Sequence, residues 1–477
     1  MSVKAIPSAE PMLKFANDAD DVVQMYGKSA TIHGVHAIIT PQAFKWRRYV
    51  WLLLLIGMTF SLSFFLYLQF KKYASHPVVS SINVEFTDDL KLPDITICNS
   101  NNFHRDRIPD EPILKELLFN MSDLNYLRYQ LNGTARPSTP KSTDSFTGPY
   151  LRKFAEDATH KVKDMFMVCE WQYKSLNCSR YLRKRFTDFG VCYTLTSNQD
   201  SPIALPVLSP SNTANNLRLI VNIEQDKYYY SRSSQSGIKV VLHEQNTEPS
   251  PFQHGFYVQP GTSTSVTFGI TKYSWLPEPY KAFGNTSCEE IDDRTFKTEN
   301  NTYQYSKDAC VSNCIRNYLF KQCNCNFFLN RGPEPFCSLT ELQDCLFPHM
   351  HNISHAHISN CHCPTPCQVT EYEARLSVAN FASTFIKDYL VNINLIKSAD
   401  TIDENLIDLR IQYSAVSAII KQQKPEITIE GILGNLGGHM GLFIGASVMS
   451  LFELLEFLII YLHQLCKHGF QKTRKKK

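Results

Sequence analysis

Two carboxylates lie inside a long apolar stretch near the C-terminal end of the sequence. Residues 431–466 read GILGNLGGHMGLFIGASVMSLFELLEFLIIYLHQLC, and Glu453 and Glu456 are their only formally charged residues. A carboxylate in hydrocarbon costs several kcal/mol unless it faces water or a partner. The pair therefore predicts that this stretch borders an aqueous pathway or its inner mouth.

Glycines precede these carboxylates at a helical spacing. Gly437, Gly441 and Gly445 recur every four residues, and a stripe of small residues lets membrane helices approach closely. Glycine also frees backbone carbonyls where a helix is broken, which a membrane tolerates only beside protein or a water-filled cavity. Close helix packing alone would explain the stripe, whereas the stripe and the carboxylates together favour a pore.

A second apolar segment lies near the N-terminus. Residues 49–70 carry no charge and are flanked by lysines and arginines; as a helix they would be about 33 Å long, enough to cross a bilayer. The segment starts too deep in the chain for a signal peptide. The basic tail 471–477 fits a cytoplasmic end, either as a simple stop-transfer anchor or in contact with anionic lipid.

Cysteine usage separates the middle of the chain from its ends. Of 15 cysteines, 14 lie from Cys98 to Cys367, and Cys466 stands apart. This distribution predicts seven disulfides in an oxidising compartment, although spacing alone leaves the pairing open. The same region holds all six Asn-X-Ser/Thr glycosylation sites, which are Asn120, Asn132, Asn177, Asn285, Asn300 and Asn352.

These features predict a plasma-membrane protein with both termini cytoplasmic. The expected parts are a cytoplasmic N-terminus at 1–48, a span at 49–70, an extracellular cysteine-rich domain at 71–430, a second span at 431–465 and a cytoplasmic tail at 466–477. Strand-like runs at 217–224, 237–244, 264–270 and 408–416, a helix at 307–323, and helices in 110–163 around a linker at 135–149 predict a mixed α/β ectodomain.

Composition excludes several other classes. The 477 residues are 43% hydrophobic, and 48 basic against 45 acidic residues give a net charge of only +3. This argues against disorder and against a nucleic-acid partner. No phosphate loop, nucleophile elbow or zinc-binding helix motif is present, so neither an enzyme nor a cofactor is expected. A disulfide-rich surface receptor or ectoenzyme with two anchors is the rival from another class.

The chain resembles the degenerin/epithelial sodium channel family, which includes acid-sensing and peptide-gated channels. The resemblance covers almost the whole chain and rests on motifs in a fixed order. They are His33-Gly34, LPDITICN at 92–99, FTDFGVCYTL at 186–195, a cysteine array at 288–367 ending in CHCPTPC, and GLFIGAS at 441–447.

The resemblance implies an acid-sensing-channel-like homo- or heterotrimer, with two transmembrane helices per subunit around a sodium-conducting pore that amiloride-type compounds block. Gly445, Ala446 and Ser447 would form the selectivity filter. Further implied pore and gate positions are Gly431, Gly441, Glu453 and Glu456, and His33-Gly34 is implied in gating.

The resemblance also implies the disulfide pairing and a contact near the membrane. The implied pairs are Cys98–Cys192, Cys169–Cys178, Cys288–Cys367, Cys310–Cys363, Cys314–Cys361, Cys323–Cys345 and Cys325–Cys337. Tyr73 and Tyr280 resemble a pair that couples the ectodomain to the spans, although the family more often has tryptophan at the second position. Ordinary packing is the alternative for these tyrosines.

Two groups of titratable residues have two interpretations each. Glu426 and Glu430 precede the second span, where three copies of each would form acidic rings that concentrate cations and favour Ca²⁺ entry. The alternative is that they are solvated helix-end charges.

Five histidines lie close together in residues 348–363. They could bind zinc or copper or respond to acid, or they belong to a flexible glycosylated loop, so no metal site is assigned.

The stimulus is inferred from departures from the proton-gated pattern. Residues 231–240 contain no acidic residue, Pro333 replaces a usual Asp, and a histidine pair after the first span is reduced to His76. These departures resemble the peptide-gated branch, in which extracellular neuropeptides ending in Arg-Phe-amide open the channel. Proton gating is the alternative.

Overall fold

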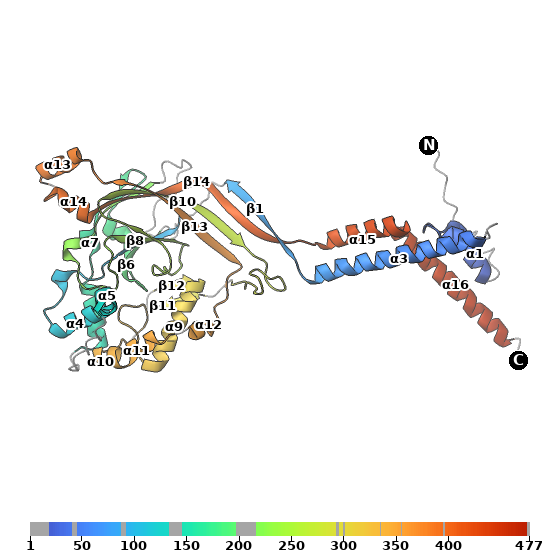
Figure 1. The fold of residues 1–477 in the computed structure, drawn as a ribbon, viewed down its shortest axis with the longest axis horizontal. Helices are drawn as coiled ribbons and strands as arrows, with labels where there is room; N and C mark the ends of the chain where they lie inside the picture. Colours follow the sequence, from blue (N-terminus) through green and yellow to red (C-terminus); the bar gives the residue numbers. More distant parts are fainter. Residues whose placement is uncertain are drawn as a thin grey trace. The chain divides into compact units, whose positions relative to one another are not determined.

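The computed structural model describes residues 19–40, 45–86, 92–132, 146–196, 216–291, 295–298, 301–333, 335–353, 355–394 and 396–474. The chain forms two compact units (Figure 1). One unit combines the two ends of the chain, residues 1–79 and 424–477, and the other contains residues 80–423.

The first unit is helical. Its helices are α1 (Ala19–Ser29), α2 (Val35–Ile39), α3 (Lys45–Ala74), α15 (Ile429–Ile444) and α16 (Val448–Arg474). Helix α3 is long and apolar enough to span a membrane, and α15 with α16 would form a second span that bends by 69° at its break. Helix α3 extends beyond the predicted 49–70 at both ends, because the flanking basic residues continue the helix.

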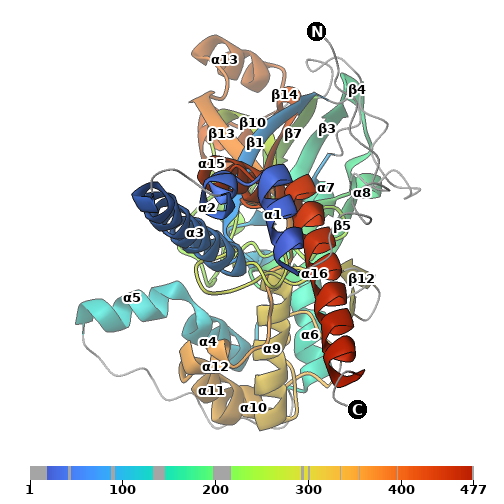
Figure 2. The same ribbon diagram turned by 90° about the vertical axis from the view of Figure 1, so that its right-hand side faces the viewer.

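Aromatic contacts hold these helices together. The Phe65 ring of α3 stacks on His439 and Phe443 of α15, with centroids 5.7 and 5.4 Å apart. Tyr26 of α1 stacks on Phe457 of α16 at 4.4 Å, and Figure 2 shows α1 lying against α16. The N-terminal segment is therefore fastened to the C-terminal helix of the same chain.

Two β-sheets and a hairpin organise the second unit. The larger sheet has the order β13 (Gln368–Asn380), β10 (Thr262–Ser274), β14 (Leu406–Pro425), β7 (Asn216–Asn222), β3 (Phe166–Trp171), β4 (Lys174–Ser175), with β1 (Val78–Phe86) also paired to β14. The smaller sheet has the order β5 (Leu182–Thr187), β6 (Gly190–Leu195), β2 (Asp94–Asn99), β8 (Ile238–His243), β9 (Phe256–Val258). The hairpin is separate and consists of β11 (Thr295–Thr298) and β12 (Asn301–Gln304). All four predicted strand runs lie on strands, β7, β8, β10 and β14.

The two sheets share one apolar core. Side chains alternate between buried and half-buried along β7, as expected for strands with one face toward a core. Ile97, Leu219, Phe268 and Leu409 are fully buried members of that core.

A second core lies among the helices of this unit. The helices of the whole unit are α4 (Pro112–Met121), α5 (Asp123–Asn132), α6 (Gly148–Asp157), α7 (Val162–Met165), α8 (Cys178–Tyr181), α9 (Lys307–Cys323), α10 (Leu339–Glu341), α11 (Phe347–His351), α12 (His355–Ser359), α13 (Thr384–Asn392) and α14 (Ala399–Asn405), with the 3-10 turns η2 (Arg105–Arg107) and η4 (Gln225–Lys227) and the π-helix η5 (Leu342–Leu346). The core lies among α4, α6, α9, α10 and η5. Leu117, Leu151, Phe328 and Leu342 are buried in it. Residues 133–145, most of the predicted linker, lie outside the described residues.

Seven disulfides fasten this unit, and they join the same pairs that the family resemblance implies. Cys310 and Cys314 lie one turn apart on α9 and bind Cys363 and Cys361 of the returning chain. Ser306 caps α9 by accepting a hydrogen bond from the Ala309 N–H at 3.2 Å. The helix therefore begins and ends at the predicted residues, 307 and 323.

A buried carboxylate joins three strands of the larger sheet. Asp408 of β14 accepts hydrogen bonds from Arg218 Nε of β7 (2.8 Å), Arg410 Nη2 (3.0 Å) and Ser263 Oγ of β10 (2.9 Å). Burial alone would raise the pKa of Asp408, but these hydrogen bonds outweigh it and hold the pKa below its ordinary value.

Asp408→Asn is expected to destabilise the folded chain by about 2 to 3 kcal/mol, because it leaves two arginines beside an uncharged partner. Since the folded-state pKa is depressed, the stabilisation is present above the unfolded pKa of about 3.9 and is lost as the pH falls through the lower folded value. In thermal unfolding experiments, the purified Asp408→Asn variant should have a lower midpoint than the wild type at pH 7. Its midpoint should then fall less than that of the wild type when the pH is lowered below 4. The exposed Asp226, changed to Asn, is the matched control; equal midpoints for all three proteins would contradict the assignment.

Candidate functional site

The helix break between α15 and α16 is the centre of the candidate site. Gly445 ends α15 in the left-handed conformation, with φ of 64°. Its N–H donates to the Gly441 carbonyl at 3.1 Å, and the Ala446 N–H donates to the Met440 carbonyl at 3.2 Å. The turn satisfies two carbonyls at the end of α15, and helix α16 then starts at Val448 in a new direction.

The first turn of α16 is fixed by a serine. Ser450 Oγ accepts a hydrogen bond from the Ser447 N–H at 3.0 Å, and the Ser450 N–H donates to the Ser447 carbonyl at the same distance. Ser450 and Ala446 are buried, whereas Ser447 is exposed. Ser447 is therefore exposed on a turn whose backbone is fixed by hydrogen bonds at the end of α15 and in the first turn of α16.

The segment between α1 and α2 docks into this break. The His33 N–H donates to the Ile444 carbonyl at 3.1 Å, which satisfies another carbonyl at the end of α15. A Cβ atom on Gly445 would lie 1.3 Å from His33 Nδ1. Residue 445 must therefore be glycine both for its positive φ and for the imidazole beside it. Gly34, with φ of 85°, then turns the chain into α2.

Glu453 is bound by the same segment. Its Oε2 accepts hydrogen bonds from the Thr31 hydroxyl at 2.9 Å and from the Thr31 N–H at 3.3 Å, and Thr31 Oγ1 lies 2.6 Å from Ser450 Oγ. The structure thus brings together His33 and Gly34, the predicted filter residues 445–447 and Glu453. Sequence analysis missed Thr31 and Ser450, since nothing in one sequence links two hydroxyl residues so far apart.

The other predicted pore residues lie apart from this cluster. Glu456 is exposed on α16, and its side chain forms no ion pair or hydrogen bond with the described residues. Gly441 lies in the last turn of α15, and a Cβ there would meet nothing within 4 Å in this chain. Gly431 lies in the first turn, where its N–H donates to Thr428 Oγ1 at 3.1 Å.

The predicted acidic residues lie just before α15 and in its first turn. Glu426 forms an ion pair with Lys72 at the end of α3, and its N–H donates to the Pro77 carbonyl at 2.9 Å. Glu430 is exposed in the first turn of α15. The two carboxylates therefore differ, because a lysine partly neutralises only Glu426.

The predicted coupling tyrosines belong to different units. Tyr73 lies in the last turn of α3, with its ring 6.2 Å from that of His76. The Tyr280 N–H donates to the Pro277 carbonyl at 3.0 Å within the second unit. Their coupling stays a prediction.

The predicted glycosylation sites differ in exposure. Asn177, Asn285 and Asn352 are exposed. Both side-chain amide atoms of Asn120 are enclosed, so a glycan there would require this side chain to turn outward. The side chain of Asn132 and the whole of Asn300 lie outside the described part of the structure.

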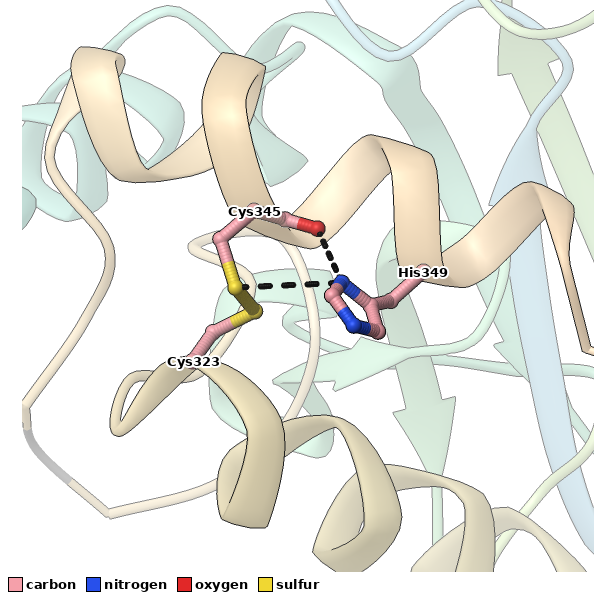
Figure 3. A group of neighbouring side chains, drawn as sticks. All are labelled: Cys323, Cys345 and His349. Atoms are coloured by element: carbon pink, nitrogen blue, oxygen red, sulfur yellow. Dashed lines mark hydrogen bonds between the residues drawn. A yellow bond between two sulfur atoms is a disulfide. The ribbon is translucent and has the colours of Figure 1, made fainter.

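The histidine-rich segment does not assemble a metal site in the described part of the chain. The one group of three ligand atoms there that lies close enough is Cys323, Cys345 and His349 (Figure 3). Both sulfurs form a disulfide, so neither is a thiolate that could bind a metal. His349 Nδ1–H donates to the Cys345 carbonyl at 2.8 Å, while His357 packs on the Tyr318 ring and His362 lies 3.7 Å from Glu289.

Two carboxyl groups beside α9 have perturbed pKa values. Asp188 and Glu248 line a cavity of about 240 Å³ with Arg316 and Arg331. Burial raises the pKa of Asp188 despite hydrogen bonds from Ser250 Oγ and the Phe252 N–H. Burial also raises the pKa of Glu248, although Arg331 lies 2.8 Å from it. Both carboxyls are therefore able to take up protons at a higher pH than exposed ones.

Comparison with known proteins gives consistent matches. The sequence model of the amiloride-sensitive sodium channel family matches residues 26–457. Acid-sensing ion channel 1 of Gallus gallus is 29% identical over 474 residues, which cover 95% of this chain and 86% of that protein. Acid-sensing ion channel 2 of Homo sapiens is 28% identical over 456 residues, which cover 91% and 86%.

A solved structure of a proton-activated chloride channel covers 86% of this chain and 96% of its own, with a TM-score of 0.32 and 9% identity, a likeness too low to bear on fold or function. The family match spans most of the chain, including the helix break and the cysteine array. The chain therefore belongs to the amiloride-sensitive sodium channel family, the degenerin/epithelial sodium channel family that its motifs resemble.

Proposed function

We propose that this chain is a subunit of a trimeric, amiloride-sensitive cation channel in the plasma membrane, with the helix break at 445–447 as its sodium filter. The observation that carries the proposal is the docking of the N-terminal segment into the break. Unwound backbone at membrane depth is tolerated only where it is buried in protein or lines water, and here one side is covered by His33 while Ser447 is exposed.

The filter would act by replacing part of the hydration shell of sodium. Three copies of residues 445–447 would place carbonyl and hydroxyl oxygens around one axis, at a width fixed by the absence of a side chain at Gly445. Glu456 would lie toward the inner mouth, and Glu453 would hold the N-terminal segment. This arrangement requires both chain ends to be cytoplasmic and residues 71–430 to be extracellular.

The gating stimulus we propose is an extracellular peptide of the Arg-Phe-amide type. Residues 231–240 offer no carboxylate, and His76 is followed directly by proline, so two elements of the proton-gated pattern are missing. Subunits of other sequence could complete the trimer.

Proton gating is the second candidate, and a specific observation favours it. Asp188 and Glu248 share one cavity beside α9 and have raised pKa values. Protonation of either group would weaken its attraction to the neighbouring arginines. The relatives described above are acid-sensing channels by name.

Whole-cell recording separates the two stimuli. Cells that express this chain alone should show an inward current, blocked by amiloride, when an amidated Arg-Phe peptide is applied at constant neutral pH. A step to pH 5 without peptide should give little current. The reverse result would favour proton gating, and Asp188→Asn with Glu248→Gln should then reduce the acid response. Surface biotinylation controls for delivery to the membrane.

Gly445→Ala is expected to lower selectivity for Na⁺ over K⁺ or to abolish the current while the protein still reaches the surface. The added methyl group would overlap the His33 ring and strain the positive φ. Gly434→Ala is the matched control, because a Cβ there meets nothing within 4 Å in this chain. Reversal potentials under bi-ionic conditions report the selectivity; a wild-type value for Gly445→Ala would exclude residue 445 from the filter.

Calcium entry is proposed to depend on Glu430 more than on Glu426, because Lys72 forms an ion pair only with Glu426. Glu430→Gln should lower the permeability to Ca²⁺ relative to Na⁺, since it removes one carboxylate per subunit from the outer mouth. Lys72→Gln should act in the opposite direction by freeing Glu426. Reversal-potential shifts on replacing Na⁺ with Ca²⁺ measure both, and no shift in either variant would indicate that these are solvated helix-end charges.

A further inference from the structure

The disulfide between Cys323 and Cys345 has an imidazole beside it (Figure 3). Cys323 is the last residue of α9, and Cys345 lies in the π-helix η5. His349 follows Cys345 by four residues in the continuous helical run 339–351, so the two side chains are neighbours on its surface. The Nδ1 atom of His349 lies 3.9 Å from Cys345 Sγ. One ligand atom from each of the three residues lies within 4.8 Å of the other two.

This arrangement is close to the geometry of a zinc site. Two thiolates and an imidazole nitrogen are a ligand set typical of Zn²⁺. Tetrahedral zinc, with Zn–S of about 2.3 Å and Zn–N of about 2.0 Å, places sulfur and nitrogen about 3.5 Å apart and two sulfurs about 3.8 Å apart. The 3.9 Å between His349 Nδ1 and Cys345 Sγ is near that value. Only the bond between the two sulfurs prevents metal binding.

Contacts other than this disulfide hold the three residues near one another. A second disulfide joins Cys325, just beyond the end of α9, to Cys337, just before the helical run 339–351. The two segments also pack in one buried core through Leu319, Leu342 and Leu346. Opening the bond between Cys323 and Cys345 would therefore leave both sulfurs close to their present positions.

The disulfide is accessible from one side. Cys345 is half-buried, whereas Cys323 is only 8% exposed. A thiolate of an external dithiol would attack Cys345 Sγ, form a mixed disulfide with it and release Cys323 as a thiolate. The second thiol of the dithiol would then close the donor's own disulfide and release Cys345. The dithiol supplies the two electrons, and its two protons pass to the medium when Zn²⁺ binds both thiolates.

We propose that Cys323, Cys345 and His349 are a redox-controlled zinc site, which is blocked while the disulfide is intact and binds Zn²⁺ after reduction by an extracellular dithiol. Water would complete the tetrahedron. The charge of Zn²⁺ would neutralise the two thiolates, so no net charge would be buried. Zinc would replace the disulfide as the link between α9 and η5, and a chelator could then remove that link. The inference does not depend on the proposed ion pathway.

Protection from alkylation tests the site on the purified full-length chain. The protein is reduced with dithiothreitol, transferred to neutral buffer without reductant, and alkylated with iodoacetamide with or without Zn²⁺. Mass spectrometry of its peptides measures the rate at each cysteine. When free Zn²⁺ exceeds its dissociation constant tenfold, alkylation of Cys323 and Cys345 should slow by about 10-fold, because only unoccupied sites react. A chelator should reverse the protection. Cys314 and Cys361, where they are reduced, should gain none.

Two histidine variants test the third ligand. His349→Gln leaves both cysteines in place, so the oxidised protein keeps its disulfide, and it should abolish most of the protection by Zn²⁺. His351→Gln is the matched control, because His351 belongs to the same helix but lies outside the group of ligand atoms. Thermal unfolding of the oxidised variants checks that both are folded.

Three results would overturn the proposal. They are a lack of protection at Cys323 and Cys345, equal protection of Cys314 and Cys361, and undiminished protection in His349→Gln. The proposal also fails if dithiothreitol opens the bond between Cys323 and Cys345 only when the chain unfolds, which tryptophan fluorescence of the same samples reports.

Discussion

The break in the second apolar helix leaves backbone groups that need hydrogen-bond partners, and the rest of the first unit provides them. Unwinding a helix at residues 445–447 frees backbone groups that hydrocarbon cannot hydrogen-bond. The chain supplies partners from its own N-terminal segment: His33 reaches the last carbonyl of α15, and Thr31 reaches the first turn of α16 through Ser450. Glycine at 445 leaves the space that this docking requires. The N-terminal segment is therefore part of the proposed pathway.

The second unit is held by a different set of constraints. Disulfides fasten α9 to the returning chain, and Asp408 joins three strands through two arginines and a serine. Rigid elements of this kind are able to transmit displacement of an outer surface, which a channel opened from outside requires. The cavity beside α9, with Asp188 and Glu248, borders the fastened helix. Either proposed stimulus could act on this rigid part of the fold.

Local patterns predicted much of this architecture. The strand-like runs 217–224 and 264–270 predicted β7 and β10, and the one-turn spacing of Cys310 and Cys314 predicted α9 at its observed bounds. Two apolar segments located α3 and the α15–α16 pair. The disulfide pairs needed the family resemblance, because spacing leaves many pairings open. Contacts between distant residues were beyond sequence reasoning: the docking of His33 beside Gly445, the binding of Glu453 by Thr31 and the pairing of Glu426 with Lys72 each depend on how the ends of the chain fold together.

The central claim is that residues 445–447 line an ion pathway and that the N-terminal segment of the chain holds them there. A structure of the full chain in lipid nanodiscs, determined by electron cryomicroscopy, tests this claim most directly. The account predicts three copies with their 445–447 segments around one axis, and His33 within hydrogen-bonding distance of Ile444 at each. Segments 445–447 that face lipid, or a break without residues 31–34 beside it, would contradict the account.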